Sequence, residues 1–584
     1  MSVNQWLLFL LIIQVVHFLG TWKLYVKAGK QAWEAAIPVY NAIVLMKIIN
    51  RPTWWTVLLF IPVINLIMFP VIWVETLRSF GKNTTKDTIL AIVTFGLYIY
   101  VINYSNDAQY IQDRSTVATT KTGDFISSIL FAIVVATLVH TYLIQPFQIP
   151  TSSLEKSLLV GDFLFVSKVN YGARTPMTPV AAPMVHDTIF GANIKSYLAK
   201  PQLPYFRFPG FESIKNNDIV VFNWPTDTLF NMYLPADKRY DKPIDKKTNY
   251  VKRCVAIPGD SLQIKDGIVF INSKELILPE RAKPQYFHTV ETKTPLTLDL
   301  LQRYDITEAS SFHKIKADFW DNGEVQKFFY DNKINLNEVS RDSSLVTVTG
   351  EIDNEKYNSK VKEVIKGLQF ESLNNMLNMN LTFEKVALLK KDPEIKSVTR
   401  YISKGGEDGI FPDHKDGTIA KDFTWNNDNF GPIYIPKRGT KVSLNLQVLP
   451  IYKKIITEYE GNTLKVEGNS IFVNGTKTDS YTFQKDYYWM MGDNRHNSLD
   501  ARYFGYTPDD HIVGKPIFIW MSWDSNGKGF NKIRWDRLFT TVSGEGQPQS
   551  YFKYFLFFLV IYNVGMYFWN KKKENNYKIE QRVE

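Results

Sequence analysis

Five apolar stretches constrain this chain more than any other feature, because they separate membrane-spanning segments from one long polar region. Trp54–Val74, Thr88–Tyr104 and Phe125–Ile144 are each long enough to cross a hydrocarbon core of about 30 Å. Trp6–Gly20 is also apolar, but no basic segment precedes it and no small-residue cleavage site follows, so we expect a retained anchor. Phe555–Trp569 is shorter and rich in Phe and Tyr. The pattern predicts a chain anchored in a membrane on both sides of the polar region.

A lysine cluster at Lys571–Lys573, directly after the last apolar run, indicates a cytoplasmic end. The polar region before that run therefore lies outside the cytoplasm, provided that the apolar segments on both sides of it cross. The upstream topology stays open. Ala36–Ile49 is interrupted by polar residues and fits a re-entrant or interfacial helix as well as a span. If its basic neighbours are cytoplasmic, other basic residues of the region lie outside, which conflicts with the rule that positive residues stay on the cytoplasmic side.

The charge and cysteine content argue against a nucleic-acid-binding protein and against a domain held by disulfides. Lys and Arg number 68 against 58 Asp and Glu, and these basic residues are scattered rather than gathered in a stripe, so we expect no nucleic-acid partner. Cys254 is the only cysteine, which rules out an intrachain disulfide. An exported domain of this chain must hold itself together by packing.

The polar region has the pattern of a mainly-β domain. "GDFLFVSKVNYG" alternates apolar and polar residues, "DIVVFNWP" resembles a buried strand, and Pro258-Gly259 and Asp266-Gly267 punctuate a hairpin. From 276 to 460 Lys and Glu increase, and "NEKYNSKVKEVIKGLQF" and "LTFEKVALLKKDPEI" have helical spacing. We predict antiparallel sheets, in a sandwich or barrel, interrupted by an inserted α+β subdomain.

An imperfect repeat brackets that insertion. "GDSLQIKDGIVFINSKE" from Gly259 resembles "GNTLKVEGNSIFVNGTK" from Gly461, and each reads as strand, turn and strand. Either one hairpin was duplicated or two similar hairpins arose independently.

Two residues carry the chemistry that the sequence suggests. A serine hydroxyl attacks a carbonyl only when a base accepts its proton, and none of the eight histidines falls in a recognisable triad motif. A lysine can replace histidine if burial lowers its pKa from about 10.4 toward neutrality. Lys252 lies in the apolar context "NYVKRCVAIPG", and Ser153 follows an apolar run. Taken singly, each has an ordinary explanation: Ser153 as a turn residue and Lys252 as a solvated strand charge.

Three ordered motifs give these residues a family context. "QPFQIPTSSLEKSLLVGDFLFVSKVNYG", "NYVKRCVAIPGD" and "MMGDNRHNSLDARYFG" resemble the successive sequence boxes of type I bacterial signal peptidases, the membrane-bound Ser/Lys endopeptidases of S26 type. The resemblance covers roughly residues 145–271 and 466–535, and it leaves out the N-terminal region and the insertion.

The resemblance implies a role for each matching position. Ser153 matches the nucleophile and Lys252 the general base, while Thr151 would help the Ser153 backbone N–H to hold the oxyanion and Ser498 would orient the lysine. The matching charged framework is structural and comprises Arg253, Asp493, Asp500 and Arg502. The positions of the small apolar substrate pockets are Phe147, Ile149, Pro150, Leu154, Leu158, Leu164, Tyr250 and Val251. Such pockets suit Ala-x-Ala before the cleaved bond.

The resemblance also implies the fold and the setting of the reaction. The fold class is a multi-span α-helical membrane region plus a mainly-β extracytoplasmic catalytic domain with an inserted α+β subdomain, in the bacterial plasma (inner) membrane. The function is removal of N-terminal signal peptides from exported proteins by acyl transfer from Ser153, without metal or other cofactor. The partners are preproteins carrying signal peptides and the lipid bilayer, with the export machinery as a further candidate.

The predicted domain boundaries follow from these motifs. They are an N-terminal membrane region with about three spans (1–123), an anchor (124–145), the first part of the catalytic domain (146–275), the insertion (276–460), the second part (461–540), a C-terminal span (551–570) and a basic cytoplasmic tail (571–584).

Three departures from the family pattern and two alternatives remain. Leu154 stands where Met is common, Lys156-Ser157 where Pro-Thr usually follows, and His496 where Asp is commoner.

Ser153 to Lys156 is also an S-x-x-K string, as in penicillin-binding proteins and β-lactamases, but Lys121-Thr122-Gly123 precedes the serine instead of following it. A non-enzymatic membrane-anchored β scaffold is the second alternative, which a Lys252→Ala variant would separate from a peptidase.

Overall fold

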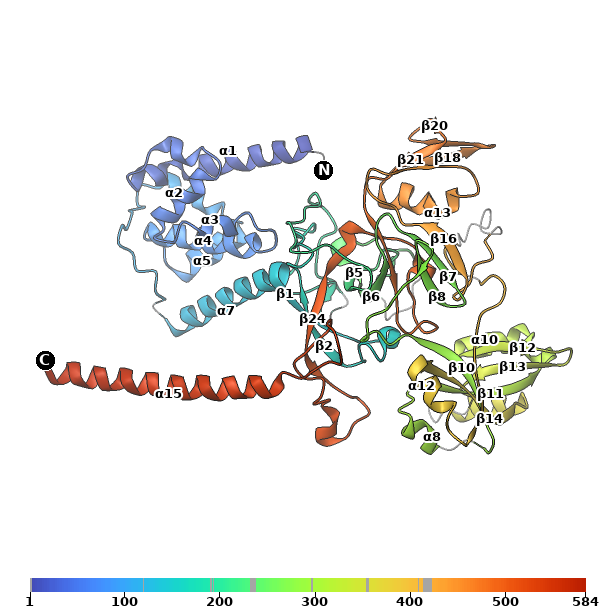
Figure 1. The fold of residues 1–584 in the computed structure, drawn as a ribbon. Helices are drawn as coiled ribbons and strands as arrows, with labels where there is room; N and C mark the ends of the chain where they lie inside the picture. Colours follow the sequence, from blue (N-terminus) through green and yellow to red (C-terminus); the bar gives the residue numbers. More distant parts are fainter. Residues whose placement is uncertain are drawn as a thin grey trace.

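The computed structural model describes residues 3–118, 120–189, 192, 194–231, 238–295, 298–352, 357–407, 409–412 and 423–583. Figure 1 shows three parts: helices of the N-terminal region on one side, a β-rich centre, and an α+β subdomain on the opposite side of that centre. The predicted combination of apolar helices with mainly antiparallel sheets is confirmed.

The N-terminal region is a bundle of helices with its own apolar core. Its helices are α1 (Val3–Lys27), α2 (Tyr40–Ile48), α3 (Trp55–Leu58), α4 (Asn65–Ser79), α5 (Thr85–Val93) and α6 (Tyr98–Tyr104), with a short 3-10 helix at Ala32–Ala35. Leu24, Met46 and Ile72 belong to one buried cluster in this bundle. The region therefore has a packed core of its own.

Two of the predicted spans in this region are not continuous helices. Trp54–Val74 is divided between α3 and α4, because Pro62 cannot donate a helical hydrogen bond and Val63 has a φ of 72°. Thr88–Tyr104 is divided between α5 and α6, which are bent by 119° around Gly96. Neither stretch is therefore one continuous helix, although α5 and α6 together are long and apolar enough for a broken span or a re-entrant loop. α2 is too short to cross a bilayer.

Three helices among the described residues are long and apolar enough to cross a membrane, or four if the bent pair counts as one span. They are Asn4–Lys27, Lys121–Leu143 and Phe552–Lys573. The second combines α7 (Lys121–Leu138) with a π-helical turn at Val139–Leu143, and the third lies within α15 (Phe552–Val583). Figure 1 shows α7 and α15 leaving the β-rich centre toward the same side as the N-terminal helices.

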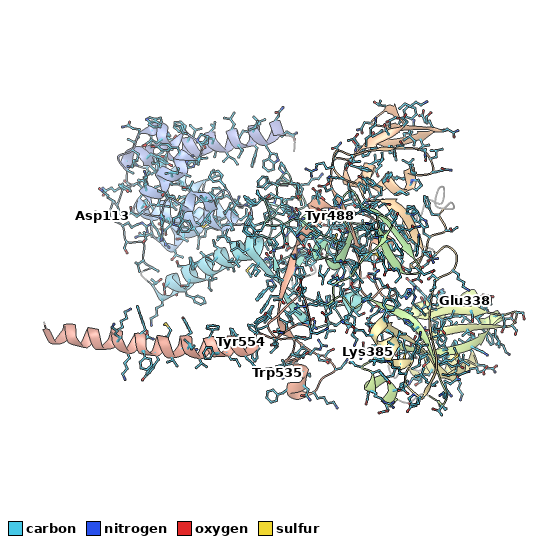
Figure 2. The ribbon with its side chains drawn as sticks, viewed as in Figure 1. Asp113, Glu338, Lys385, Tyr488, Trp535 and Tyr554 are labelled. Carbon is cyan, nitrogen blue, oxygen red and sulfur yellow. The ribbon has the colours of Figure 1, made fainter. Side chains whose placement is uncertain are left out.

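Aromatic contacts fasten the start of α15 to the β-rich centre. The ring of Phe539 lies 4.5 Å from that of Phe555, and Trp535 lies 5.9 Å from Phe552. Figure 2 shows Trp535 and Tyr554 on this side of the molecule, whereas Glu338 and Lys385 mark the inserted subdomain. The insertion thus lies away from the candidate spans.

The main sheet brings together strands from both ends of the polar region. In spatial order it consists of β1 (Ile144–Gln148), β2 (Asp162–Ser167), β24 (Ile512–Ser522), β5 (Ile219–Asn223), β6 (Asn249–Ala256), β22 (Tyr487–Met491) and β23 (Thr507–Pro508), with β25 (Thr540–Thr541) beside β24. The named pairs are antiparallel. β24, from the last part of the domain, joins the early strands β2 and β5.

Both faces of this sheet are covered, as the apolar run in β5 predicted. Alternate residues of a strand point to opposite faces, and Val220 and Phe222 belong to one buried cluster while Ile219 and Val221 belong to another. The larger cluster contains Trp489 and many other aromatic side chains. These two layers of apolar packing hold the sheet without any disulfide.

The inserted subdomain is a second antiparallel sheet covered by helices. Its strands are, in spatial order, β12 (Leu336–Arg341), β13 (Leu345–Gly350), β11 (Ala309–Lys316), β14 (Glu371–Thr382), β10 (Gln285–Thr292) and β15 (Ile395–Arg400). Its helices are α8 (Leu298–Arg303), α9 (Ala317–Trp320), α10 (Gly323–Asp331), α11 (Ser359–Gly367) and α12 (Phe383–Leu389). The two segments with helical spacing form α11 and α12, as predicted.

The repeated hairpins have the same local structure. The first forms β7 (Ser261–Lys265), β8 (Ile268–Ile271) and β9 (Lys274–Glu275), and the second forms β18 (Leu464–Glu467), β19 (Ser470–Val473) and β20 (Thr476–Thr478). β16 (Phe430–Tyr434) pairs with β7, so the end of the predicted 276–460 insertion packs with the first part of the catalytic domain.

Short elements complete the chain between these sheets. They are β3 (Thr188–Ile189), β4 (Ile194–Lys195), β17 (Lys441–Ser443), β21 (Ser480–Thr482), α13 (Leu449–Lys454), α14 (Ala501–Phe504), a π-helical turn at Ile455–Tyr459, and 3-10 turns at Ser152–Leu154, Ile244–Lys246, Asp509–His511 and Gly529–Lys532.

Candidate active site

Ser153 lies on a short turn that buried leucines hold in place. The turn is a 3-10 helix at Ser152–Leu154 between β1 and β2. Leu154 and Leu158 are each only 1% exposed, so their side chains anchor the turn in the apolar layer below it. Lys156 has a φ of 67°, which reverses the chain toward β2. Ser153 itself is buried.

Lys252 reaches Ser153 from the middle of the sheet. It lies on β6, paired with Val220 of β5, and its side chain is buried. Its Nζ donates a hydrogen bond of 2.5 Å to Ser153 Oγ. Burial lowers the pKa of Lys252 from 10.5 to about 8; the charge of Asp500 opposes this shift and that of Arg502 adds to it. A lysine with this pKa can take up and return a proton near neutral pH.

The neighbouring residue on β6 belongs to a buried ion pair. Arg253 donates from Nε and Nη2 to the two oxygens of Asp493, at 2.8 and 2.6 Å. Ser157 Oγ donates to the same carboxylate at 2.6 Å. Burial alone raises the pKa of Asp493, but the charge and hydrogen bonds of Arg253, with that of Ser157, bring it below its ordinary value. The pair ties β6 to the loop that follows β22.

A second buried pair shapes that loop. Arg502 donates from Nε and Nη2 to Asp500, at 2.9 and 2.7 Å, and the Gly492 N–H donates to Asp500 at 3.0 Å. Arg502 also donates to the carbonyl oxygens of Asn427 and Arg495. The two ion pairs of Arg253, Asp493, Asp500 and Arg502 therefore brace the loop, and the charges of Asp500, Arg502 and Asp493 act on Lys252.

One predicted site residue, Ser498, is placed differently from expectation. Ser498 is buried next to the turn, but its Oγ makes no hydrogen bond within the part of the chain that the structure describes, so the expected contact with Lys252 is not formed. Thr151 is exposed and does not cap the turn with its side chain. Ser498 and the serine turn pack so closely against Gly492 that a Cβ at this position would collide with Ser498 Oγ and with the Ser153 carbonyl oxygen.

The predicted substrate-pocket residues divide into a buried floor and a partly open rim. Ile149, Leu154, Leu158 and Leu164 are between 0 and 4% exposed and form one cluster, against which Phe147 and Val251 pack while partly exposed. Tyr250 stacks on Trp224 at 5.0 Å, and Pro150 is exposed. An apolar surface thus lies beside Ser153.

The inserted subdomain is linked to the serine turn through two asparagines of the loop after β22, which the sequence did not indicate. The Glu308 carboxylate accepts hydrogen bonds from Asn494 Nδ2 at 3.0 Å and from Asn497 Nδ2 at 3.3 Å. Asn494 Nδ2 also donates to the Ser152 carbonyl oxygen and Asn497 Nδ2 to Ser152 Oγ, each at 3.1 Å. Asn380 donates to Glu308 at 2.6 Å. We call this set the Glu308 network.

His496 forms a second connection between the insertion and the same loop. Its Nδ1 accepts a hydrogen bond of 3.0 Å from the Phe287 N–H, and its Nε2 lies 3.0 Å from Asp428 Oδ1. This histidine stands at a position where the family more often has an aspartate. It joins β10 of the insertion to the segment before β16. No short-range pattern marks such contacts, because the partners lie far apart in the sequence.

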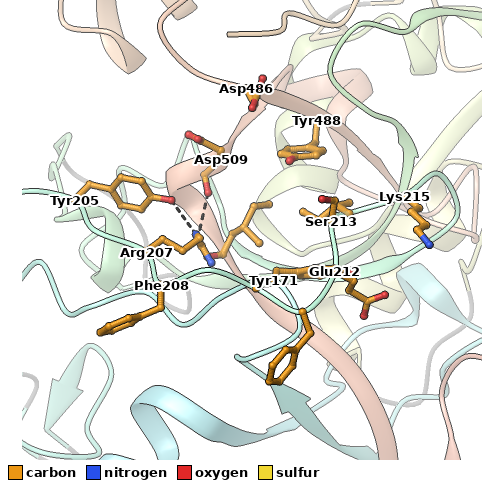
Figure 3. Close-up of a pocket in the computed structure, with 14 residues that line it drawn as sticks. Tyr171, Tyr205, Arg207, Phe208, Glu212, Ser213, Lys215, Asp486, Tyr488 and Asp509 are labelled. Carbon is orange, nitrogen blue, oxygen red and sulfur yellow. Dashed lines mark hydrogen bonds between the residues drawn. The ribbon is translucent and has the colours of Figure 1, made fainter.

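A cavity of about 690 Å³ lies elsewhere on the β-rich centre (Figure 3). Its walls include Tyr205, Arg207, Tyr488 and Asp509, and neither Ser153 nor Lys252 lines it. Arg207 is fully engaged there, with hydrogen bonds to Tyr205 Oη and to backbone carbonyls that include that of Asp509. The reactive pair is therefore separate from this cavity.

No group of three or more His, Cys, Asp or Glu side chains that could hold a metal ion occurs among the described residues. The chemistry available at the site is that of a serine hydroxyl and a lysine amine. With this pair next to a candidate span, the fold and site define a membrane-anchored hydrolase.

The comparisons with known proteins identify its family. The sequence model described as "Signal peptidase, peptidase S26" matches residues 122–318 and 434–523, and a family of unknown function (DUF5684) matches residues 33–113. Signal peptidase I of Buchnera aphidicola subsp. Acyrthosiphon pisum is 23% identical over 433 residues, covering 73% of this chain and 85% of the relative.

Two further relatives carry the same name. Signal peptidase I of Buchnera aphidicola subsp. Baizongia pistaciae is 22% identical over 411 residues, covering 70% of this chain and 79% of the relative. The Haemophilus influenzae protein is 30% identical over 149 residues, covering 24% of this chain and 35% of the relative. The chain belongs to the S26 family of signal peptidases and is a membrane peptidase.

Proposed function

We propose that this protein is a serine endopeptidase that removes signal peptides from exported preproteins, with Ser153 as nucleophile and Lys252 as general base. The observation that carries the proposal is the hydrogen bond between Lys252 Nζ and Ser153 Oγ, made by two buried side chains. It also favours Lys252 over the other lysine near the serine. Lys156, the lysine of the S-x-x-K string, instead forms an ion pair with Asp305 at 2.8 Å.

The reaction is acyl transfer. Neutral Lys252 takes the proton of Ser153, whose Oγ attacks the carbonyl carbon of the cleaved bond. The negative oxygen that develops is stabilised by the Ser153 backbone N–H and the Thr151 hydroxyl, a contribution of typically about 3 kcal/mol per donor. Protonated Lys252, favoured by the charge of Asp500, then donates its proton to the leaving amine. Finally, Lys252 activates the water that hydrolyses the acyl-enzyme.

The position of the site explains which peptide bond is cut. β1 alone separates the serine turn from the end of the Lys121–Leu143 helix, so Ser153 lies close to the membrane surface. A signal peptide whose apolar segment lies in the bilayer presents its cleavage point at this level. The apolar surface formed by Phe147, Val251 and the leucines under the turn supports a preference for small side chains, as in Ala-x-Ala.

We assign the β-rich centre and the insertion to the extracytoplasmic side of the bacterial plasma (inner) membrane. Lys571–Lys573 at the end of the last candidate span support a cytoplasmic C-terminus, and the chain crosses the membrane more than once.

Cleavage of a preprotein with an Ala-x-Ala site, by the full chain in detergent, tests this function. We expect wild type to cut after the second Ala, and Ser153→Ala and Lys252→Ala to lose essentially all activity. Ser261→Ala and Lys265→Ala, which remove the same two groups from the exposed ends of β7, are the matched controls and should keep it. Activity that persists in either of the first two variants would show that the pair is wrongly assigned.

A further inference from the structure

A second cavity, of about 200 Å³, lies where the candidate span that contains α7 meets the β-rich centre. Thr137 and Thr141, near the end of that span, form part of its wall. Val63 of the N-terminal helical bundle also lines it and packs against Ala181 of the β-rich centre. Because a helix leaves the hydrocarbon core at this point, the cavity lies at the level of lipid headgroups.

Lys168 lines this cavity and is buried without an anionic partner. It directly follows β2, its backbone N–H donates to the Leu143 carbonyl oxygen at 2.8 Å, and the residue is only 8% exposed. Within the described ranges its Nζ forms no hydrogen bond and no ion pair, and the ring of Phe147 lies 5.9 Å away. Burial, with the nearby charges of Arg174 and Arg207, lowers the pKa of Lys168 well below its ordinary value, so an anion that entered the cavity would favour the charged amine and would itself be stabilised by it.

The other charged groups of the cavity leave an excess of positive charge. Arg174 and Lys246 line it together with Lys168, against the single carboxylate of Asp245. Asp245 is occupied by a different segment of the chain, accepting from the N–H and the hydroxyl of Thr178 at 3.0 and 2.6 Å. Arg174 donates to neutral oxygens, a backbone carbonyl and a side-chain amide. The structure gives none of the three cations a carboxylate as hydrogen-bond partner among the described residues.

We propose that this cavity binds the phosphate group of an anionic phospholipid, with Lys168 as its central cation. Phosphate is the anion that surrounds the end of every membrane span, and charged hydrogen bonds from lysine and arginine are the usual means of holding it. The bound headgroup would lie between the span and the sheet that carries Ser153, and would fasten the β-rich centre to the bilayer. The proposal concerns lipid binding and does not depend on the roles assigned to Ser153 and Lys252.

The test uses the full chain in a non-ionic detergent and measures thermal unfolding against added lipid. We expect phosphatidylglycerol to raise the Tm of wild type and phosphatidylcholine to leave it almost unchanged. Lys168→Met should require at least about tenfold more phosphatidylglycerol for the same shift, since it loses one charge-assisted contact. Lys168→Arg should respond like wild type. Lys477→Met, which removes one exposed lysine from β20, is the matched control for net charge.

The behaviour without anionic lipid separates binding from a structural role. Replacing a buried, uncompensated cation by an apolar side chain of similar length should leave the Tm of Lys168→Met equal to or above that of wild type. An unchanged response of Lys168→Met to phosphatidylglycerol would overturn the proposal. A shift that inorganic phosphate reproduces in full, with nothing added by phosphatidylglycerol, would identify a soluble phosphate as the ligand and would overturn the assignment to lipid.

Discussion

Glu308 of the inserted subdomain should control the rate of cleavage without touching the substrate. Its carboxylate holds Asn494 and Asn497, and both of these side chains hold Ser152, the residue before the proposed nucleophile. Glu308→Ala removes the carboxylate that these amides share and leaves only their hydrogen bonds to Ser152 to hold them in place. We expect the serine turn to lose its fixed position while the sheet around Lys252 remains folded.

The size of the effect follows from the hydrogen bonds that are lost. A hydrogen bond to a charged group contributes about 1.5–3 kcal/mol, and about 1.4 kcal/mol corresponds to a factor of ten. If one such hydrogen bond positions Ser153 for attack, its loss lowers kcat by about 10- to 100-fold. KM should change less, because the proposed substrate side chains pack against Phe147 and Val251, which the Glu308 network does not contact.

The assay measures kcat and KM on a peptide with an Ala-x-Ala site, together with the Tm of each variant in detergent. Glu338→Ala is the matched control, since Glu338 pairs with Arg341 within the insertion and makes no contact with the serine turn (Figure 2). Glu308→Gln should recover part of the rate, because its side-chain oxygen still accepts one hydrogen bond. A kcat for Glu308→Ala within about twofold of wild type would refute the positioning role, as would a loss of kcat that only follows unfolding.

Three further predictions concern the reactive pair and its supports. The value of kcat/KM should rise with pH through about 8 and then level off, because Lys252, with its pKa lowered to about 8, must be neutral to accept the serine proton, and a pH–rate profile checks this. Asp493→Asn should lower the free energy of unfolding by about 3–5 kcal/mol, measured by denaturation, since it leaves Arg253 buried without its counter-charge. Gly492→Ala should reduce kcat by about 100-fold, because the added Cβ collides with Ser498 Oγ and displaces the turn.

Each of these predictions has a control and a contradicting result. A profile that falls with rising pH would mean that the working form of the lysine is charged. Asp241→Asn disrupts an exposed pair, with Asp241 73% exposed, and should leave stability almost unchanged; an equal loss in both variants would argue against a burial effect. Gly367→Ala has open space around its Cβ and should be harmless, and full activity of Gly492→Ala would contradict the packing argument.

The sequence could predict features that depend on local pattern. The apolar run in β5, the helical spacing of α11 and α12 and the repeated hairpins all fold as expected, since period and turn residues determine them within a few residues. The ordered family motifs placed Ser153 and Lys252 as partners, and the structure brings their side chains into contact. Their catalytic roles remain a prediction.

Features set by tertiary contacts could not be predicted. The break in Trp54–Val74 is a different case, because Pro62 marks it in the sequence although hydropathy alone does not detect it. The pairing of β16 with β7 returns the chain to the main domain before the predicted end of the insertion. The Glu308 network joins residues nearly two hundred positions apart, so no spacing rule could have found it.

The position of β24 makes the main sheet depend on almost the whole chain. In the strand order of that sheet, β24 lies between β2, which follows the Ser153 turn, and β5, the neighbour of the strand β6 that carries Lys252. A chain synthesised only as far as the insertion holds both Ser153 and Lys252 but lacks Ile512–Ser522, the strand that joins β2 to β5. The sheet beneath the two residues is therefore complete only near the end of synthesis.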